Sequence, residues 1–296
     1  MAKQMINILI NGIAEQSIHV SDRGLSYGDG LFETIAVQRA VPLLWGEHLQ
    51  RMRLGAERLA IPFNQATEQA FYQDFTKLMA TAVHQSQDTI LKLTLTRGIG
   101  ARGYKADPNA SVTRIAALSA KPDMSTAQRQ GVNIHLCATQ LARQPLLAGI
   151  KHLNRLEQVI ARSEWHDPSV TEGIVCDTAG YVIEGCMSNV FWVTDGVLYT
   201  PDLSQAGVAG VVRNKLLQLC ALNTLAEQRV GEYQLQQLLA ADEIFVCNSV
   251  FNILPVSAVL SCSSTSNFTP VPFSIGAITT TLQQLLQQYY LKENKL

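Results

Sequence analysis

Lys151 is the first residue whose type and position could do covalent chemistry. It lies just after a glycine-rich turn and just before an amphipathic stretch, in the segment GIKHLNRLEQV at residues 149–159. A lysine in a partly buried pocket at such a junction can have a pKa low enough to form an imine with a carbonyl compound. Taken alone, however, a lysine is far more often a solvated surface residue. The surrounding motifs must therefore decide between the two interpretations.

A second segment, EGCMSN at residues 184–189, begins with Glu184 between apolar residues and a turn of small residues. A carboxylate in such surroundings is unfavourable to bury without a cationic partner. A protonated pyridine nitrogen would be such a partner, because keeping that nitrogen charged lets a pyridoxal ring accept electrons. A cap of the turn, or a pair with an arginine, explains the same residue equally well.

Two glycines in GVAGVVR, residues 207–213, precede an apolar-periodic stretch. Free backbone N–H groups at a helix start bind anions, and glycine lets a phosphate group come close. Many helices begin after glycine, so this pattern is weak by itself. Arg51, in an earlier periodic stretch, can add a bidentate donor to the same anion, although a solvated helix residue is the default interpretation.

The elements expected to position these residues begin with an α+β unit at residues 1–118. Asn11-Gly12 is typical of a tight turn between two strands, and apolar residues at helical spacing follow from residue 47 until Pro62. The pattern predicts strands at 5–10, 17–20, 32–37, 41–45, 89–96 and 113–118, and helices at 47–61 and 68–84.

Residues 119–130 lack either periodicity and are the expected linker to a second domain at 131–296, which carries Lys151. In that domain the pattern predicts strands at 132–139, 173–176, 190–193 and 243–246, and helices at 153–165, 210–221 and 275–290.

Composition excludes several classes of function. The chain has 296 residues, 47% of them hydrophobic, and 23 basic against 24 acidic residues, so nothing favours a nucleic-acid or membrane partner. The six cysteines form no C-x-x-C pair, and the start of the chain has no signal-peptide pattern, so we expect a cytoplasmic protein. No Cys/His cluster or helical histidine pair is present in the sequence, so no metal is expected.

Residues 21–34, SDRGLSYGDGLFET, resemble the N-terminal signature of the fold-type IV pyridoxal-phosphate enzymes, which include branched-chain and D-amino-acid transaminases and 4-amino-4-deoxychorismate lyases. The segments around Lys151, Glu184 and residues 207–213, and Cys247-Asn248-Ser249, follow in the family's order. The resemblance extends from about residue 8 to about residue 256. It implies a two-domain α/β fold like that of D-amino-acid aminotransferase, with the cofactor between the domains.

Within this family, GIKHLNRLEQV and the segment RGIGARGY at residues 97–104 resemble the lyase branch, and transaminases diverge at both. The resemblance implies cleavage of 4-amino-4-deoxychorismate to 4-aminobenzoate and pyruvate in folate biosynthesis. A transaminase of the same fold is the nearest alternative, and a non-catalytic relative that binds the cofactor is a more distant one. A homodimer is also implied, and association with the synthase that makes the substrate is left open.

The resemblance also implies roles for individual residues. Lys151 forms the Schiff base and is the catalytic residue, and Glu184 faces the pyridine nitrogen of pyridoxal 5'-phosphate. The other expected residues are the phosphate ligands Arg51, Val211, Val212 and Asn248, and the substrate contacts Arg102, Arg97, Tyr104 and Thr34. D-Amino-acid transaminases carry Arg-x-His where this chain has Arg102-Gly103-Tyr104, which puts the histidine's share of carboxylate binding in doubt.

Overall fold

The computed structural model describes residues 7–80, 88–263 and 267–293 and divides the chain into two compact units. Unit 1 contains Met1–Lys121 and Ile150–Asn154, and unit 2 contains Pro122–Gly149 and Arg155–Lys295. The short segment that carries Lys151 therefore packs with unit 1, although the residues just before and just after it in the sequence belong to unit 2. The domain limits expected from the sequence stay a prediction.

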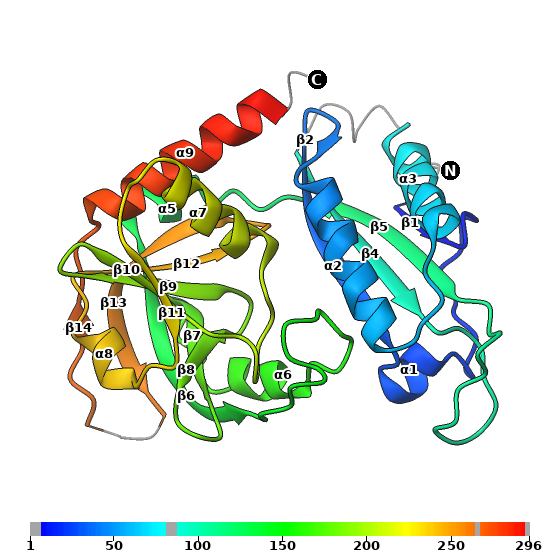
Figure 1. Ribbon diagram of the computed structural model, residues 1–296, viewed down its shortest axis with the longest axis horizontal. Coiled ribbons are helices and arrows are strands. Elements are labelled where there is room, and N and C mark those ends of the chain that lie inside the picture. Colours follow the sequence, from blue (N-terminus) through cyan, green and yellow to red (C-terminus); the bar gives the residue numbers. More distant parts are fainter. Residues whose placement is uncertain (1–6, 81–87, 264–266, 294–296) are drawn as a thin grey trace. The chain divides into compact units, whose positions relative to one another are not determined.

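Unit 1 is a five-stranded sheet in the order β1-β5-β4-β2-β3, with α2 and α3 on one face (Figure 1). All neighbouring strands are antiparallel. The strands are β1 (Ile8–Ile10), β2 (Gly30–Gln38), β3 (Val41–Pro42), β4 (Thr89–Thr96) and β5 (Thr113–Ala120), and the helices are α1 (Arg23–Tyr27), α2 (Trp45–Arg58) and α3 (Gln65–Met79).

Local sequence explains these elements. β4 alternates, so that Leu91, Leu93 and Leu95 share one fully buried face while Lys92 points to the other and is exposed. α3 begins after Asn64, whose side chain accepts a hydrogen bond from the helix's first turn. The helices cover the leucine face of β4, the central strand, and β2 lies between β4 and the short edge strand β3.

Unit 2 is built on a nine-stranded mixed sheet in the order β11-β10-β9-β12-β13-β6-β7-β8, with β14 paired to β13. β6 runs parallel to both β7 and β13. The strands are β6 (Val132–Leu141), β7 (Val170–Asp177), β8 (Val182–Gly185), β9 (Asn189–Thr194), β10 (Val197–Pro201), β11 (Gln228–Gly231), β12 (Glu243–Asn248), β13 (Asn252–Cys262) and β14 (Val271–Pro272), and the helices are α5 (Ser125–Gln130), α6 (Leu156–Arg162), α7 (Val211–Leu222), α8 (Leu235–Leu239) and α9 (Ala277–Glu293).

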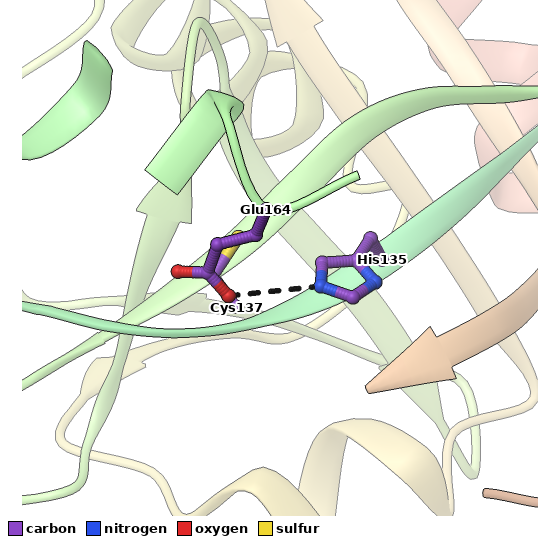
Figure 2. A group of neighbouring side chains, drawn as sticks. All are labelled: His135, Cys137 and Glu164. Carbon is purple, nitrogen blue, oxygen red and sulfur yellow. Dashed lines mark ion pairs between the residues drawn. The ribbon is translucent and has the colours of Figure 1, made fainter. Parts of the chain in front are cut away.

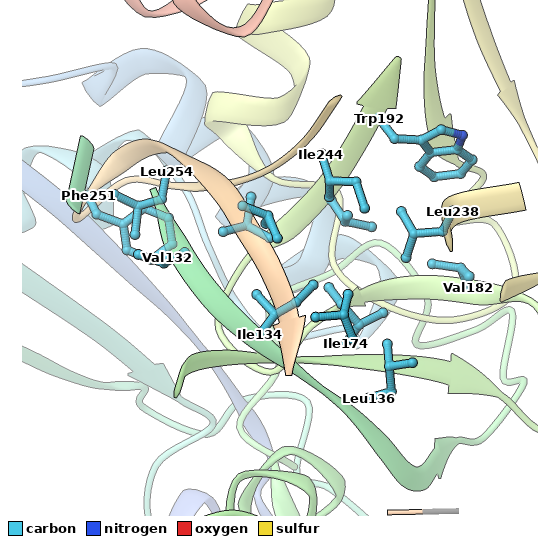
Figure 3. Packing of buried hydrophobic residues seen from close by; sticks show 14 residues of the cluster. Val132, Ile134, Leu136, Ile174, Val182, Trp192, Leu238, Ile244, Phe251 and Leu254 are labelled. Carbon is cyan, nitrogen blue, oxygen red and sulfur yellow. The ribbon is translucent and has the colours of Figure 1, made fainter. Parts of the chain in front are cut away.

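The core of unit 2 joins strands that are far apart in sequence (Figure 3). Ile134 on β6, Ile174 on β7, Ile244 on β12 and Leu254 on β13 are each at most 1% exposed and belong to one apolar cluster. Burial of such side chains is the main favourable contribution to folding. This cluster holds β7, β8 and β9 together, and these strands carry Glu172, Glu184 and Asn189, which are discussed below.

One predicted strand is wrong, and another is too long. Asn11 and Gly12 do form a turn, with φ angles of 50° and 82°, but residues 17–20 form no strand, and β1 pairs instead with β5. The predicted strand at 41–45 ends at Pro42, because Leu44 adopts a left-handed φ of 54° and α2 begins at Trp45. Residues 5–6 and 81–84 of the predicted elements lie outside the described residues.

Several elements were not predicted, among them the long strand β13 and the helix α5, which lies within the expected linker. β13 contains Pro255, which argues against a strand when only local sequence is considered.

In the described part of the chain, no helix combines the length and the apolar character that a membrane span requires.

Candidate active site

Lys151 is held against the start of β2. Its carbonyl oxygen accepts a hydrogen bond from the Phe32 N–H at 3.0 Å, and the Leu153 N–H donates to the carbonyl oxygen of Gly30 at 3.0 Å. The Lys151 ammonium lies 4.4 Å from the centroid of the Phe32 ring. The residue is half-buried beside an aromatic face, so it is less solvated than an ordinary surface lysine.

Two glycines of unit 1 permit this close packing. A Cβ atom at Gly30 would lie 2.5 Å from the carbonyl oxygen of Leu95 and 2.7 Å from Leu153 Cδ1. A Cβ atom at Gly55 on α2 would lie 2.8 Å from a methyl group of Leu31. A side chain at either position would displace β2 or the segment that carries the lysine.

Arg51 on α2 binds the buried carboxylate of Glu33 on β2. Arg51 Nε donates to Glu33 Oε1 at 2.8 Å, Arg51 Nη2 donates to Oε2, and His48 Nδ1 lies 2.6 Å from Oε2. Burial alone would raise the pKa of Glu33, but Arg51 and His48 hold it at about 2. Burial lowers the pKa of His48 itself, so Arg51 is the cation that keeps Glu33 ionised at neutral pH. Arg51 therefore has a fixed orientation.

Asp29, beside the start of β2, binds two arginines. Arg97 donates to its carboxylate through Nε and Nη2 at 2.7 and 3.0 Å, and Arg23 Nε donates at 2.8 Å. Burial would raise the pKa of Asp29, but these two arginines lower it. Arg97 also donates to the carbonyl oxygens of Leu59 and Ala60 at 2.7 and 2.6 Å. The expected substrate contact Arg97 is thus buried, and these four hydrogen bonds go to protein groups.

Arg102 and Tyr104 lie on an exposed loop that α1 anchors. Arg23 donates to the carbonyl oxygens of Gly103 and Tyr104 at 2.9 and 3.1 Å, and the Tyr27 hydroxyl accepts from the Gly103 N–H at 3.2 Å. The Tyr104 residue is 87% exposed, and its ring centroid lies 5.5 Å from that of Tyr27. The loop therefore presents both predicted substrate contacts outward from an anchored backbone.

Thr34 lies in the interior of β2, opposite Lys92 in the register, and is half-buried. Residues two apart in a strand point to the same face. Thr34 therefore shares the face of β2 on which Phe32 meets Lys151.

In unit 2, Glu184 at the end of β8 is 5% exposed and binds the loop before α7. The Val208 N–H donates to Glu184 Oε2 at 2.8 Å. Asn189 Nδ2 lies 3.5 Å from the same oxygen and donates to the Val208 carbonyl oxygen at 2.8 Å. The carboxylate, the amide and one peptide unit thus form a compact polar group.

The glycines around this loop are required by packing. A Cβ atom at Gly207 would lie 2.6 Å from Ile183 Cγ2, and one at Gly210 would lie 1.9 Å from Asn189 Oδ1. α7 follows directly, and in the described structure no side chain caps its N-terminus by a hydrogen bond. Val211 and Val212 therefore contribute first-turn N–H groups to an anion-binding helix start.

Gly149 pairs with the same loop. Its N–H donates to the carbonyl oxygen of Gly207 at 2.9 Å, and its carbonyl oxygen accepts from the Ala209 N–H at 3.0 Å. Lys151 follows two residues later in the chain. The backbone just before the lysine is thus tied to the loop that contacts Glu184.

Asn248, the expected phosphate ligand at the end of β12, binds protein groups on both sides of its amide. Nδ2 donates to the Met187 carbonyl oxygen at 3.0 Å, and Oδ1 accepts from the N–H groups of Val250 and Phe251 at 2.8 and 3.0 Å. The side chain therefore shapes the turn that contains Met187, and its contact with a phosphate stays a prediction.

Sequence reasoning missed Glu33, His48, Asp29 and Asn189. A signal for Glu33 was available, because it alternates with Leu31 and Ile35 and so falls on the apolar face of its strand. An acid at such a position needs a partner. The partners lie on another element, and local sequence does not identify them.

A cluster of His135, Cys137 and Glu164 was also not foreseen; their candidate ligand atoms lie within 4.8 Å of one another (Figure 2). The two ring nitrogens lie 2.7 Å from the hydroxyls of Ser261 and Ser263, and the carboxylate accepts two backbone N–H groups at 2.7 and 2.8 Å. A neighbouring thiol and burial raise the pKa of Cys137. Because these polar groups already have partners, we interpret the cluster as a hydrogen-bonded network.

The family description Amino-transferase class IV matches residues 30–259. The chain belongs to this family, and the fold class expected from the sequence is confirmed. An aminodeoxychorismate lyase of Vibrio harveyi is 34% identical over 93% of this chain and 97% of its own. The solved structure of 4-amino-4-deoxychorismate lyase from Pseudomonas aeruginosa has a TM-score of 0.85 and 40% identity over 95% of this chain and 98% of its own. The D-alanine aminotransferase of Bacillus licheniformis is 28% identical over 97% of this chain and 98% of its own.

Proposed function

We propose that this chain is a pyridoxal-phosphate-dependent carbon–oxygen lyase that converts 4-amino-4-deoxychorismate to 4-aminobenzoate and pyruvate in folate biosynthesis. One observation carries the proposal: identity to two lyases is 34% and 40% along almost the whole of each chain, against 30% for a putative branched-chain-amino-acid aminotransferase of Methanocaldococcus jannaschii and 28% for the D-alanine aminotransferase. The segments at residues 97–104 and 149–159 favour the same branch of the family.

The residues present fit pyridoxal phosphate. They offer an amine at Lys151, a buried carboxylate at Glu184 and the uncapped N-terminus of α7 beside Gly210. These groups match an aldehyde, a protonated ring nitrogen and a phosphate, respectively. In this proposal Lys151 holds the cofactor as a Schiff base, and Glu184 binds the ring nitrogen. The phosphate ligands are the N–H groups of Val211 and Val212 with the side chains of Arg51 and Asn248.

When bound, the cofactor supplies an electron sink for the charge that develops at the amine-bearing carbon of the substrate. In this proposal the side-chain amine of Lys151 removes the proton from that carbon. The carbon–oxygen bond of the ether then breaks, and its electron pair leaves with the oxygen as the enolate of pyruvate, which takes up a proton to give pyruvate. The remaining ring becomes aromatic, which makes the step strongly favourable. The task of the protein is therefore mainly to orient the C–H bond toward Lys151.

Arg102, Tyr104 and Thr34 are the proposed substrate contacts. The substrate carries carboxylates, and a guanidinium group can bind a carboxylate through two parallel hydrogen bonds. For Arg97, whose donors bind Asp29 and two carbonyl groups, we propose a positioning role at the base of the loop that carries Arg102.

Product analysis tests the activity. Protein loaded with pyridoxal phosphate, together with chorismate, an ammonia donor and a purified aminating synthase, should yield 4-aminobenzoate and pyruvate in equal amounts. Rapid amino transfer from D-alanine or a branched-chain amino acid, with no 4-aminobenzoate formed, would instead identify a transaminase.

A pair of lysine variants tests whether Lys151 is the residue that binds the cofactor. Lys151→Ala should lose the visible Schiff-base absorption and nearly all lyase activity. Lys92→Ala is the matched control, because its ammonium lies 5.4 Å from the centroid of the same Phe32 ring, and it should keep the absorption. Absorption that persists in Lys151→Ala would show that another lysine binds the cofactor.

A homodimer is part of the proposal, and the surface of α6 supports it. Leu156, Val159 and Ile160 are 75%, 58% and 58% exposed and lie at helical spacing. Such a spacing puts them on one face, and a contiguous exposed apolar face is typical of an interface. A second copy of this chain, docked through the same face, would cover it.

A further inference from the structure

The turn that follows Glu184 is held by a second buried acid, Glu172 on β7. Glu172 is 1% exposed. Its Oε1 accepts from the Gly173 N–H at 2.9 Å, and its Oε2 accepts from the Met187 N–H at 3.2 Å and from the Ser188 hydroxyl at 2.8 Å. The carboxylate therefore connects β7 to the turn between β8 and β9.

This turn is closed and tightly packed. The Gly185 N–H donates to the Ser188 carbonyl oxygen at 2.7 Å. A Cβ atom at Gly185 would lie 2.3 Å from Ser188 Oγ and 2.9 Å from Glu172 Cδ. Glu184 precedes the turn and Asn189 follows it, so a shift of the turn moves both members of the polar group around Val208.

Met187 is held at both ends of its backbone. Its N–H donates to Glu172, and its carbonyl oxygen accepts from Asn248 Nδ2 at 3.0 Å. The Met187 residue is nevertheless 57% exposed. The turn is thus fixed by polar contacts to its backbone rather than by burial of its central side chain.

A buried acid is an unfavourable way to obtain packing alone. Burial raises the pKa of Glu172, and an apolar residue of similar volume would fill the same space without desolvation of a carboxylate. What the acid adds is hydrogen-bond geometry, because its acceptors fix the positions of two N–H groups and one hydroxyl. Its role must therefore be sought in the residues that the turn positions.

We infer that Glu172 is a positioning residue for the cofactor: through the turn at residues 186–188 it holds Glu184 and Asn189 in the arrangement that presents the Glu184 carboxylate to the ring nitrogen. This inference rests on the proposed contact between Glu184 and that nitrogen. Glu172 itself touches neither cofactor nor substrate in this proposal.

The test compares two ligands that differ only at the ring nitrogen. Pyridoxal phosphate and its carbocyclic analogue, in which a C–H group replaces that nitrogen, are titrated into the cofactor-free protein, and tryptophan fluorescence gives both dissociation constants. Wild type should prefer pyridoxal phosphate. Glu184→Gln should lose this preference, and Glu172→Gln should reduce it by about threefold or more.

Glu164→Gln is the matched control, because Glu164 also accepts two backbone N–H groups in unit 2, but these belong to Ala138 and Thr139 on β6 rather than to the turn. It should keep the wild-type preference. If the role of Glu172 were merely structural, Glu172→Gln would weaken the binding of both ligands equally and leave the preference unchanged. If Glu172→Gln does not fold, Ser188→Ala removes one donor to the same carboxylate and should reduce the preference as well.

The outcomes separate the two proposals. An unchanged preference in Glu172→Gln and Ser188→Ala, with the preference lost in Glu184→Gln, overturns the inference about Glu172 and leaves the role of Glu184 intact. A preference that survives in Glu184→Gln overturns the proposed contact with the ring nitrogen, and with it the role of Glu172.

Discussion

At the scale of single residues, the buried acids of this chain differ in how their charge is compensated. Glu33 binds the guanidinium of Arg51 directly, whereas Glu172 accepts hydrogen bonds from neutral donors. The pKa of Glu33 is correspondingly low and that of Glu172 is raised by burial. A nearby cation favours the ionised form, and desolvation opposes it.

The variant Glu33→Gln tests how much the compensated charge of Glu33 stabilises the native state. A fall in its pKa from 4.5 to about 2 on folding means that the ionised group stabilises the native state above pH 4.5, by about 3 kcal/mol, and that this contribution is lost as the pH falls toward 2. The variant should lose about 3–5 kcal/mol at pH 7, because Arg51 is left without its carboxylate. The deficit relative to wild type should shrink at pH 3, as measured by urea unfolding.

Glu68→Gln is the control for this variant. Glu68 pairs with Arg53, which is 55% exposed, so its loss should change the free energy of unfolding by at most about 1 kcal/mol. Equal losses in the two variants at pH 7 would contradict the special contribution of the Glu33 pair.

At the scale of elements, the start of α7 depends on a small residue at its N-cap. Gly210 leaves room for Asn189 Oδ1, which would lie 1.9 Å from a Cβ atom. Asn189 in turn donates to the carbonyl oxygen of Val208 at 2.8 Å. The packing of β9 and the position of the first N–H groups of α7 are therefore linked at Gly210.

Gly210→Ala should lower the free energy of unfolding by about 1–3 kcal/mol, because the added methyl group must displace Asn189. It should also weaken binding of pyridoxal phosphate, measured by fluorescence titration. Gly46→Ala is the control, since nothing lies within 4 Å of the corresponding Cβ atom in α2, and it should be neutral or stabilising by about 0.5 kcal/mol. Wild-type affinity in Gly210→Ala would argue against an anion site at α7.

At the scale of the whole molecule, the exposed face of α6 predicts assembly. Each chain has a mass of 32.5 kDa, and light scattering of the wild type should give twice that value. Val159→Glu places a charge at the centre of the apolar face and should give the mass of one chain. Leu222→Glu alters a leucine that is 80% exposed on α7 and should remain dimeric. A monomeric wild type would refute the proposed homodimer.

The amino-acid sequence by itself determined the elements whose signal is local. The alternating pattern at residues 89–96 matches β4, and the periodic stretches predicted α2 and α7 to within a few residues. Motif order likewise identified the family, and it drew attention to Lys151 and Glu184 before their surroundings were known. Periodicity and motifs survive in the sequence because they depend on neighbours only a few residues away.

Only the tertiary structure decided which residues meet. β13 pairs with β6, more than a hundred residues earlier, and local sequence with Pro255 gave no sign of it. The partners of Glu33, Asp29 and Glu172 likewise lie on other elements. Hydrogen bonds and burial between distant segments are set by how the strands pack. This packing therefore determines which candidate residues are neighbours and how their charges are compensated.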